Sequence, residues 1–158
     1  MNSLDKKILL IGYGSTLRGD DAVGRQVVEI IADRSLPNVT TISVTQLVPE
    51  LAAQIATAQA VIFVDASGDN ELRDVDIREI VNAPGILCAP HDSSPRELLS
   101  LASVCYERTP PAWLIAVPSM SFEITDGISS AARRNSCSAV GVVERLISEV
   151  IEIEVTHA

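Results

Sequence analysis

Aromatic residues are scarce in this chain of 158 residues: they make up 3% of it, whereas 47% of its residues are apolar. The core therefore has to be built from Val, Ile, Leu and Ala. Such an aliphatic and β-branched composition suits parallel strands that alternate with helices. A chain of this length is expected to form one domain over residues 1–158, with residues 155–158 frayed. The composition thus favours a single α/β domain.

Positive charge and long apolar runs are also lacking. The chain holds 12 Lys and Arg against 21 Asp and Glu, a formal net charge of −9, and its largest basic cluster is the pair Arg133 and Arg134. We therefore expect no nucleic-acid partner and no membrane partner. No run approaches the ~20 apolar residues of a membrane span, and no secretory signal is visible. These absences predict a cytoplasmic protein.

Cysteine pairs are missing as well. Cys88, Cys105 and Cys137 are odd in number and show no C-x-x-C spacing. This pattern predicts reduced thiols that pack among apolar neighbours, and it excludes a disulfide framework or a cysteine-rich zinc site.

Apolar periodicity predicts strands that alternate with helices. Strands are expected over residues 8–11, 39–44, 60–64, 75–81 and 113–117, and helices over about 22–33, 48–57, 95–105 and a last segment whose apolar positions run from 139 to 151. Ser94 and Pro95 resemble an N-cap and a first helical residue. The charged residues within 75–81 indicate an antiparallel edge strand. The order predicts a three-layer α/β sandwich with a twisted, mostly parallel five-stranded sheet flanked by helices.

The segment 8–24, with the sequence ILLIGYGSTLRGDDAVG, organises this pattern. An apolar strand ends in Gly12 and Gly14, which allow a sharp turn, and a polar loop then leads to Asp20 and Asp21 at the start of a helix. In an open α/β sheet this loop lies at the carboxyl end of the strand, where such folds place their sites.

Three side chains that could bind a metal follow predicted strands: Asp21, Asp65 and His91. Asp65 ends a run of five apolar residues, and His91 lies in a polar loop, so all three are expected at one edge of the sheet. Two carboxylates and an imidazole form an open site for a borderline divalent ion such as zinc or nickel. Such an ion can polarise a carbonyl and acidify a bound water, as amide hydrolysis requires.

Structural roles also explain these acids. Asp20 and Asp21 suit an N-cap and a first-turn carboxylate, which stabilise a helix by about 1 kcal/mol. Asp65 could cap its own turn through Ser67 or Gly68. The residues alone leave both interpretations open.

Two other chemistries find less support. A dinucleotide fingerprint needs a third glycine where Leu17 stands, and two carboxylates at the helix start would repel a phosphate. The chain contains neither a P-loop G-K-[ST] motif nor the G-x-S-x-G motif of a nucleophilic serine. A nucleotide-binding domain remains a third alternative.

The segment 8–24, the segment 61–66 (VIFVDA), the pair Pro90 and His91, and the segment 46–52 (QLVPELA) together resemble the hydrogenase maturation endopeptidases. The resemblance covers residues 8 to about 150. It implies a single hydrogenase maturation protease domain with a phosphorylase/hydrolase-like sandwich. It also implies an enzyme that removes a C-terminal peptide from the precursor of a nickel–iron hydrogenase large subunit.

Under this resemblance the metal ligands are Asp21, Asp65 and His91, and they are also the catalytic residues. The metal is nickel carried by the substrate, for which other divalent ions can substitute. Ser15 stands where the family often has Asn, and the first ligand is Glu in some members and Asp in others.

Two routes to hydrolysis stay open. Either the metal acts as a Lewis acid or one carboxylate acts as a general base toward water. The loop from Ser119 to Gly127 is expected to touch the substrate tail. The alternative function is a non-catalytic chaperone that inspects the nickel loading of the large subunit.

Overall fold

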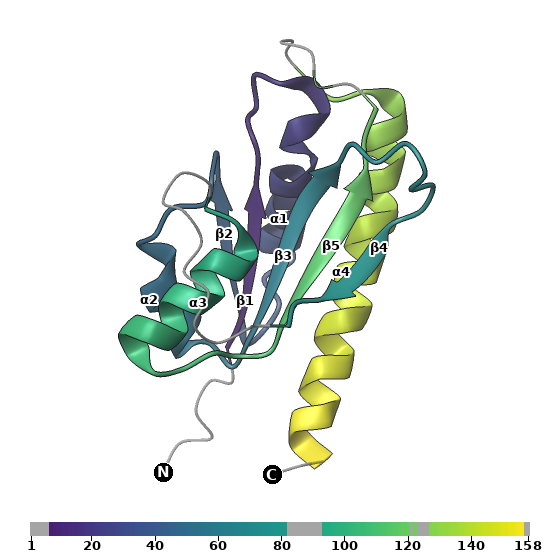
Figure 1. Ribbon diagram of the computed structural model, residues 1–158. Helices are drawn as coiled ribbons and strands as arrows, with labels where there is room; N and C mark the ends of the chain where they lie inside the picture. The colour runs from purple at the N-terminus through teal and green to yellow at the C-terminus, as the bar shows by residue number, and fades with distance from the viewer. Residues whose placement is uncertain (1–6, 82–92, 121, 123–126, 157–158) are drawn as a thin grey trace.

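The computed structural model describes residues 7–81, 93–120, 122 and 127–156 (Figure 1). The strands are β1 (Ile8–Tyr13), β2 (Val39–Val44), β3 (Ala60–Ser67), β4 (Asp76–Glu79) and β5 (Ala112–Pro118). The helices are η1, a 3-10 turn (Gly19–Ala22), α1 (Val23–Asp33), α2 (Leu51–Thr57), α3 (Pro95–Tyr106) and α4 (Ser130–Thr156).

The five strands form one sheet in the order β2-β1-β3-β5-β4. Neighbouring strands are parallel except at the edge, where β4 runs antiparallel to β5. The three-layer, mostly parallel five-stranded sandwich and its antiparallel edge strand are therefore confirmed.

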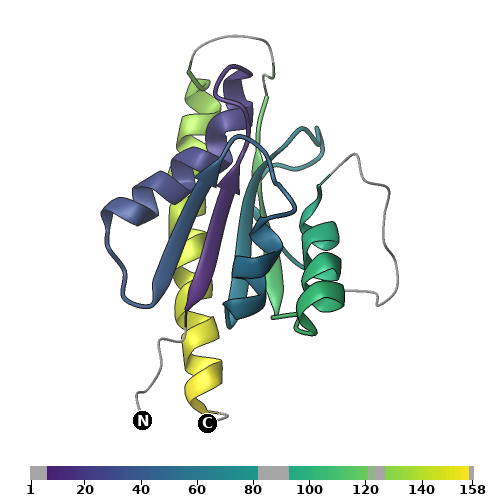
Figure 2. The same ribbon diagram turned by 90° about the vertical axis from the view of Figure 1, so that its left-hand side faces the viewer.

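Helices cover both faces of the sheet (Figures 1 and 2). Successive residues of a strand point to opposite faces, so Ile8 and Leu10 of β1 pack under α1 and α4, whereas Leu9 and Ile11 pack under α2 and α3. The same alternation divides β3, where Phe63 belongs to the second cluster. The central strands are apolar on both faces because both faces are covered.

Several boundaries differ from the predicted ones. Helix α2 begins at Leu51 and not at residue 48, because Val48 precedes Pro49 and that position disfavours the helical conformation. Helix α4 begins at Ser130, two turns before the first apolar position expected for it. It extends to Thr156, so it includes part of the segment 155–158 that was expected to fray; residues 157–158 lie outside the described part.

The predicted start of α3 is confirmed. The Ser94 hydroxyl accepts a hydrogen bond from the Glu97 N–H at 3.2 Å, and the Glu97 carboxylate accepts one from the Ser94 N–H at 3.4 Å. This reciprocal pair is a capping box.

The prediction that the cysteines pack among apolar neighbours is wrong for two of them. Cys105, in the last turn of α3, and Cys137, on α4, are exposed free thiols. Both lie on helix sides that face water, away from the apolar clusters. Cys88 lies outside the described residues.

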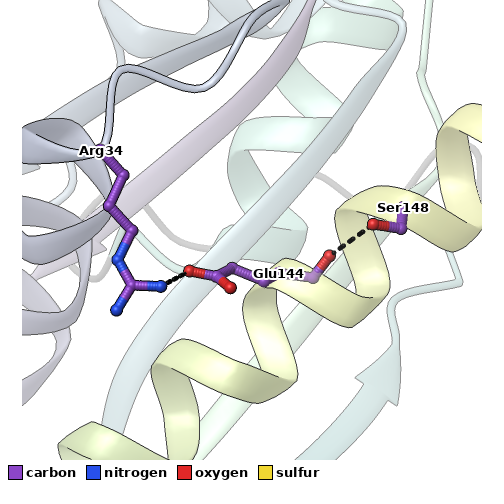
Figure 3. Close-up of polar contacts among 3 residues, drawn as sticks. All are labelled: Arg34, Glu144 and Ser148. Atoms are coloured by element: carbon purple, nitrogen blue, oxygen red, sulfur yellow. Dashed lines mark hydrogen bonds and ion pairs between the residues drawn. The ribbon is translucent and has the colours of Figure 1, made fainter.

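An ion pair joins the two helices on one face of the sheet. Arg34, directly after α1, contacts the carboxylate of Glu144 on α4, and the hydroxyl of Ser148 donates to the Glu144 carbonyl at 3.1 Å (Figure 3). The side chains of Arg34 and Glu144 are 48% and 34% exposed, so water screens their attraction and the pair contributes little to stability. Apolar packing holds the layers together.

Within the described residues, no helix combines the length and apolar character that crossing a membrane requires.

Candidate functional site

A cleft of about 510 Å³ opens at the carboxyl end of β1 and β3. The chain turns from β1 to β2 on one side and reaches β3 on the other, so this is the point where the strand order reverses and where open α/β sheets place their ligands. The cleft is lined by Tyr13, Gly14, Asp21, residues 45–49, Asp65, Ser93 and Ser94.

The loop after β1 holds Asp21 at this cleft. The Asp21 carboxylate accepts a hydrogen bond from the Ser15 N–H at 2.6 Å, which closes the loop on itself. Gly14 has a φ of +143°, and a Cβ built on it would lie 1.8 Å from the Asp21 carbonyl oxygen. A side chain at position 14 would therefore displace Asp21.

A second close approach sets the start of α1 against the sheet. A Cβ on Gly24 would lie 2.3 Å from the carbonyl oxygen of Val64, and a Cβ on Gly12 would lie 2.3 Å from the carbonyl oxygen of Gly24. Gly12 was expected to adopt an unusual backbone angle, but a glycine is needed there because α1 approaches the strand so closely. Gly24 allows the close helix–strand packing that the third glycine of a dinucleotide fingerprint would allow. In this sequence Leu17 stands at the position of that third glycine.

Asp65 lies within β3, which continues to Ser67, and its backbone neighbour across the sheet is Ala116 of β5. Its carboxylate accepts hydrogen bonds from the Tyr13 side chain and from the Ala66 N–H. Burial raises the pKa of Asp65 to about 6, and the nearby charge of Asp21 adds to the rise, whereas the two hydrogen bonds oppose it. The cleft thus holds a carboxyl group that titrates close to neutral pH.

Tyr13 is the last residue of β1. Burial raises the pKa of its hydroxyl far above the usual value, and the negative charges of Asp65 and Asp21 act in the same direction. The hydroxyl therefore stays protonated and serves as a donor. The Asp65 carboxylate is its acceptor.

Asp20, next to Asp21, points away from the cleft and is completely buried. Its carboxylate accepts hydrogen bonds from the Met120 N–H at 3.0 Å, the Ser129 N–H at 2.7 Å and the Ser129 hydroxyl at 2.8 Å. Ser129 in turn caps α4, because its hydroxyl accepts from the Ala132 N–H at 3.1 Å. Asp20 therefore ties the loop after β1 to the connection between β5 and α4.

The structure brings two of the three predicted ligands together. Asp21 and Asp65 line the same cleft. The N-cap role considered for Asp20 and Asp21 is wrong, since neither η1 nor α1 has a side-chain N-cap bond, but both acids do lie in the first turn of η1. His91 lies outside the described residues. Within those described, no three His, Cys, Asp or Glu side chains gather as a metal site, so the trio stays a prediction.

Sequence reasoning missed the roles of Tyr13 and Asp20. No sequence signal paired Tyr13 with Asp65, because the pair depends on the register between β1 and β3. Asp20 was considered only as a helix cap, and its tethering role has no local signal because its hydrogen-bond partners lie 100 and 109 residues away.

Comparison with known proteins identifies the fold. No protein-family model and no curated protein matches the chain. Solved structures do match, and they show that the chain has the fold of the hydrogenase maturation endopeptidases.

Three of these structures illustrate the likeness. Hydrogenase maturating endopeptidase HybD from E. coli is 24% identical, with 91% of this chain and 93% of that chain covered and a TM-score of 0.72. The [NiFe] hydrogenase maturation protease HycI from Thermococcus kodakarensis is 23% identical, with 93% of each chain covered and a TM-score of 0.68. A hydrogenase 2 maturation peptidase from a Thaumarchaeota archaeon is 19% identical, with coverage of 90% and 98% and a TM-score of 0.66.

Proposed function

We propose that this protein is a cytoplasmic endopeptidase that removes a C-terminal peptide from the nickel-loaded precursor of a nickel–iron hydrogenase large subunit. The observation that carries the proposal is the placement of Asp21 and Asp65 in one cleft at the strand-reversal point of the sheet. The fold supports it, because the similar structures are named as hydrogenase maturation endopeptidases and proteases.

In this proposal the nickel belongs to the substrate, and Asp21, Asp65 and His91 bind it. The donor set fits, since two carboxylates and an imidazole suit a borderline divalent ion. Two observations support His91 as the third ligand. Ser93, two positions after it in the sequence, lines the cleft, and both described carboxylates face that space.

Hydrolysis of the peptide bond needs a proton acceptor and a proton donor. The oxygen of a water attacks the carbonyl carbon, a carboxylate accepts the proton of that water, and the proton passes to the leaving amine as the C–N bond breaks. The described lining of the cleft offers two carboxylates for this transfer, Asp21 and Asp65. Bound nickel supplies Lewis acidity toward the carbonyl.

The proposal is tested with the nickel-loaded precursor and mass spectrometry of the product. The wild-type protein is expected to shorten the precursor at its C-terminus, and Asp21→Asn, Asp65→Asn and His91→Ala are each expected to abolish the cleavage. Asp69→Asn is the matched control, because Asp69 is exposed and does not line the cleft. Full cleavage by Asp65→Asn would remove that residue from the mechanism.

The same experiment separates the chaperone alternative. A chaperone would bind the nickel-loaded precursor and release it with its mass unchanged. The nucleotide-binding alternative finds no support in the loop after β1, because the Asp21 carboxylate already occupies the Ser15 N–H that a phosphate would require.

A further inference from the structure

Tyr13 and Asp65 form a pair across the two central strands of the cleft. Strands β1 and β3 are parallel neighbours, with Gly12 beside Val64. The residues that follow, Tyr13 and Asp65, therefore lie side by side. The Tyr13 ring packs against the apolar cluster under α2 and α3, and its hydroxyl donates to the Asp65 carboxylate. Both side chains line the cleft with Asp21.

A carboxylate held by one donor can still rotate about its last side-chain bond. Asp65 accepts from two groups, the Tyr13 hydroxyl and the Ala66 N–H, and each comes from a paired strand of the sheet. Two donors on rigid elements fix the plane of the carboxylate. Carboxylates that bind metal ions are commonly held this way, and removal of the supporting partner lowers metal affinity by about 10- to 100-fold.

We propose that Tyr13 is a positioning residue whose hydroxyl orients the Asp65 carboxylate so that it can bind a divalent cation in the cleft. This inference rests on the proposed function, in which the cation is the nickel of the substrate. Tyr13 itself touches neither the cation nor the peptide bond. Its task is to hold Asp65 in the orientation that the ligand needs.

The chain offers a clean test, because it contains two tyrosines. Tyr13→Phe keeps the ring and removes only the hydroxyl. Tyr106→Phe is the matched control, since Tyr106 is 52% exposed on α3 and does not line the cleft. Nickel and cadmium affinities are measured by titration calorimetry on the full-length protein without a polyhistidine tag, and urea unfolding verifies that each variant folds.

Tyr13→Phe is expected to weaken cation binding by about 10-fold or more, whereas Tyr106→Phe leaves it unchanged. A purely structural role of the hydroxyl would lower the unfolding midpoint and leave the cation affinity of the folded protein as it was, and that result overturns the inference.

Asp65→Asn separates the inference from the proposal beneath it. If Asp65→Asn abolishes cation binding and Tyr13→Phe leaves it intact, only the role of Tyr13 is rejected. Binding that survives Asp65→Asn rejects the metal site itself, and the role of Tyr13 with it. The precursor assay on the wild type reports on the peptidase activity independently of either variant.

Discussion

Adjacent acids in this protein have opposite environments. Asp21 faces the cleft, whereas Asp20 is fully buried and accepts hydrogen bonds from Met120 and Ser129. The difference follows from the 3-10 turn that carries both residues, because consecutive side chains of a helical turn point in different directions. One residue is available to ligands and its neighbour serves the fold.

Replacement of Asp20 by alanine is expected to lower the free energy of unfolding by about 3 kcal/mol. It leaves the Met120 and Ser129 N–H groups without their carboxylate acceptor, and unpaired buried donors are costly. Asp33→Ala, at an exposed position at the end of α1, is the control and should change stability by less than about 0.5 kcal/mol. Urea unfolding followed by circular dichroism measures both, and equal effects would contradict the role of Asp20.

The raised pKa of Asp65 predicts a pH-dependent stability of the metal-free protein. Because folding raises this pKa from 3.8 to about 6, the folded state binds the proton more tightly than the unfolded chain. The stabilisation from this carboxyl is complete below its unfolded pKa of 3.8 and is lost as the pH rises through about 6.

Asp65→Asn removes this titration, so the stability of the variant relative to the wild type should rise between about pH 4 and about pH 7, by at most about 3 kcal/mol. Urea unfolding in the presence of a chelator measures the difference. A difference that stays constant over this range would refute the expected shift.

Two glycines within helices provide a matched test at the level of the elements. A Cβ on Gly24 would collide with the backbone of β3, whereas a Cβ on Gly141 of α4 would meet nothing within 4 Å. Gly24→Ala is therefore expected to cost about 2 kcal/mol or more, because α1 must move off the sheet. Gly141→Ala should stabilise by about 0.5–1 kcal/mol through helix propensity. Thermal unfolding compares the two variants. Stability changes of the same sign would contradict the close packing of α1.

The order of the elements could be predicted from the sequence because their signals are local. The apolar run before Asp65 and the charged residues within 75–81 gave the buried and the edge strands. The start of α4 could not be predicted, because its first turns carry few apolar residues and are held by Ser129 and Asp20. Likewise, Asp21 and Asp65 were predicted to share an edge, but the Tyr13 bond depends on the register between two strands.

At the level of the whole molecule, β3 contributes side chains to both apolar clusters. Phe63 packs under α2 and α3, and Trp113 of β5, the single tryptophan, packs against the cluster under α1 and α4. The two halves of the core share one sheet, so they are expected to unfold together.

Phe63→Ala is expected to lower the stability by about 4 kcal/mol. The unfolding transitions recorded by tryptophan fluorescence and by circular dichroism should both shift to lower urea concentration, although Trp113 lies on the opposite face of the sheet. Ile77→Ala, at a position of β4 that is 42% exposed, is the control with a small effect. Separate transitions for the two signals would show that the faces unfold independently.

The acidic character of the cleft restricts which part of a polypeptide can lie in it. Its described lining contains Asp21 and Asp65 and no lysine or arginine, so it offers no counter-ion to a terminal carboxylate and repels one instead. A polypeptide bound there must keep its free end at a distance, with neutral backbone beside the two acids. In the proposed peptidase, this arrangement favours bonds in the interior of a chain and disfavours trimming one residue at a time.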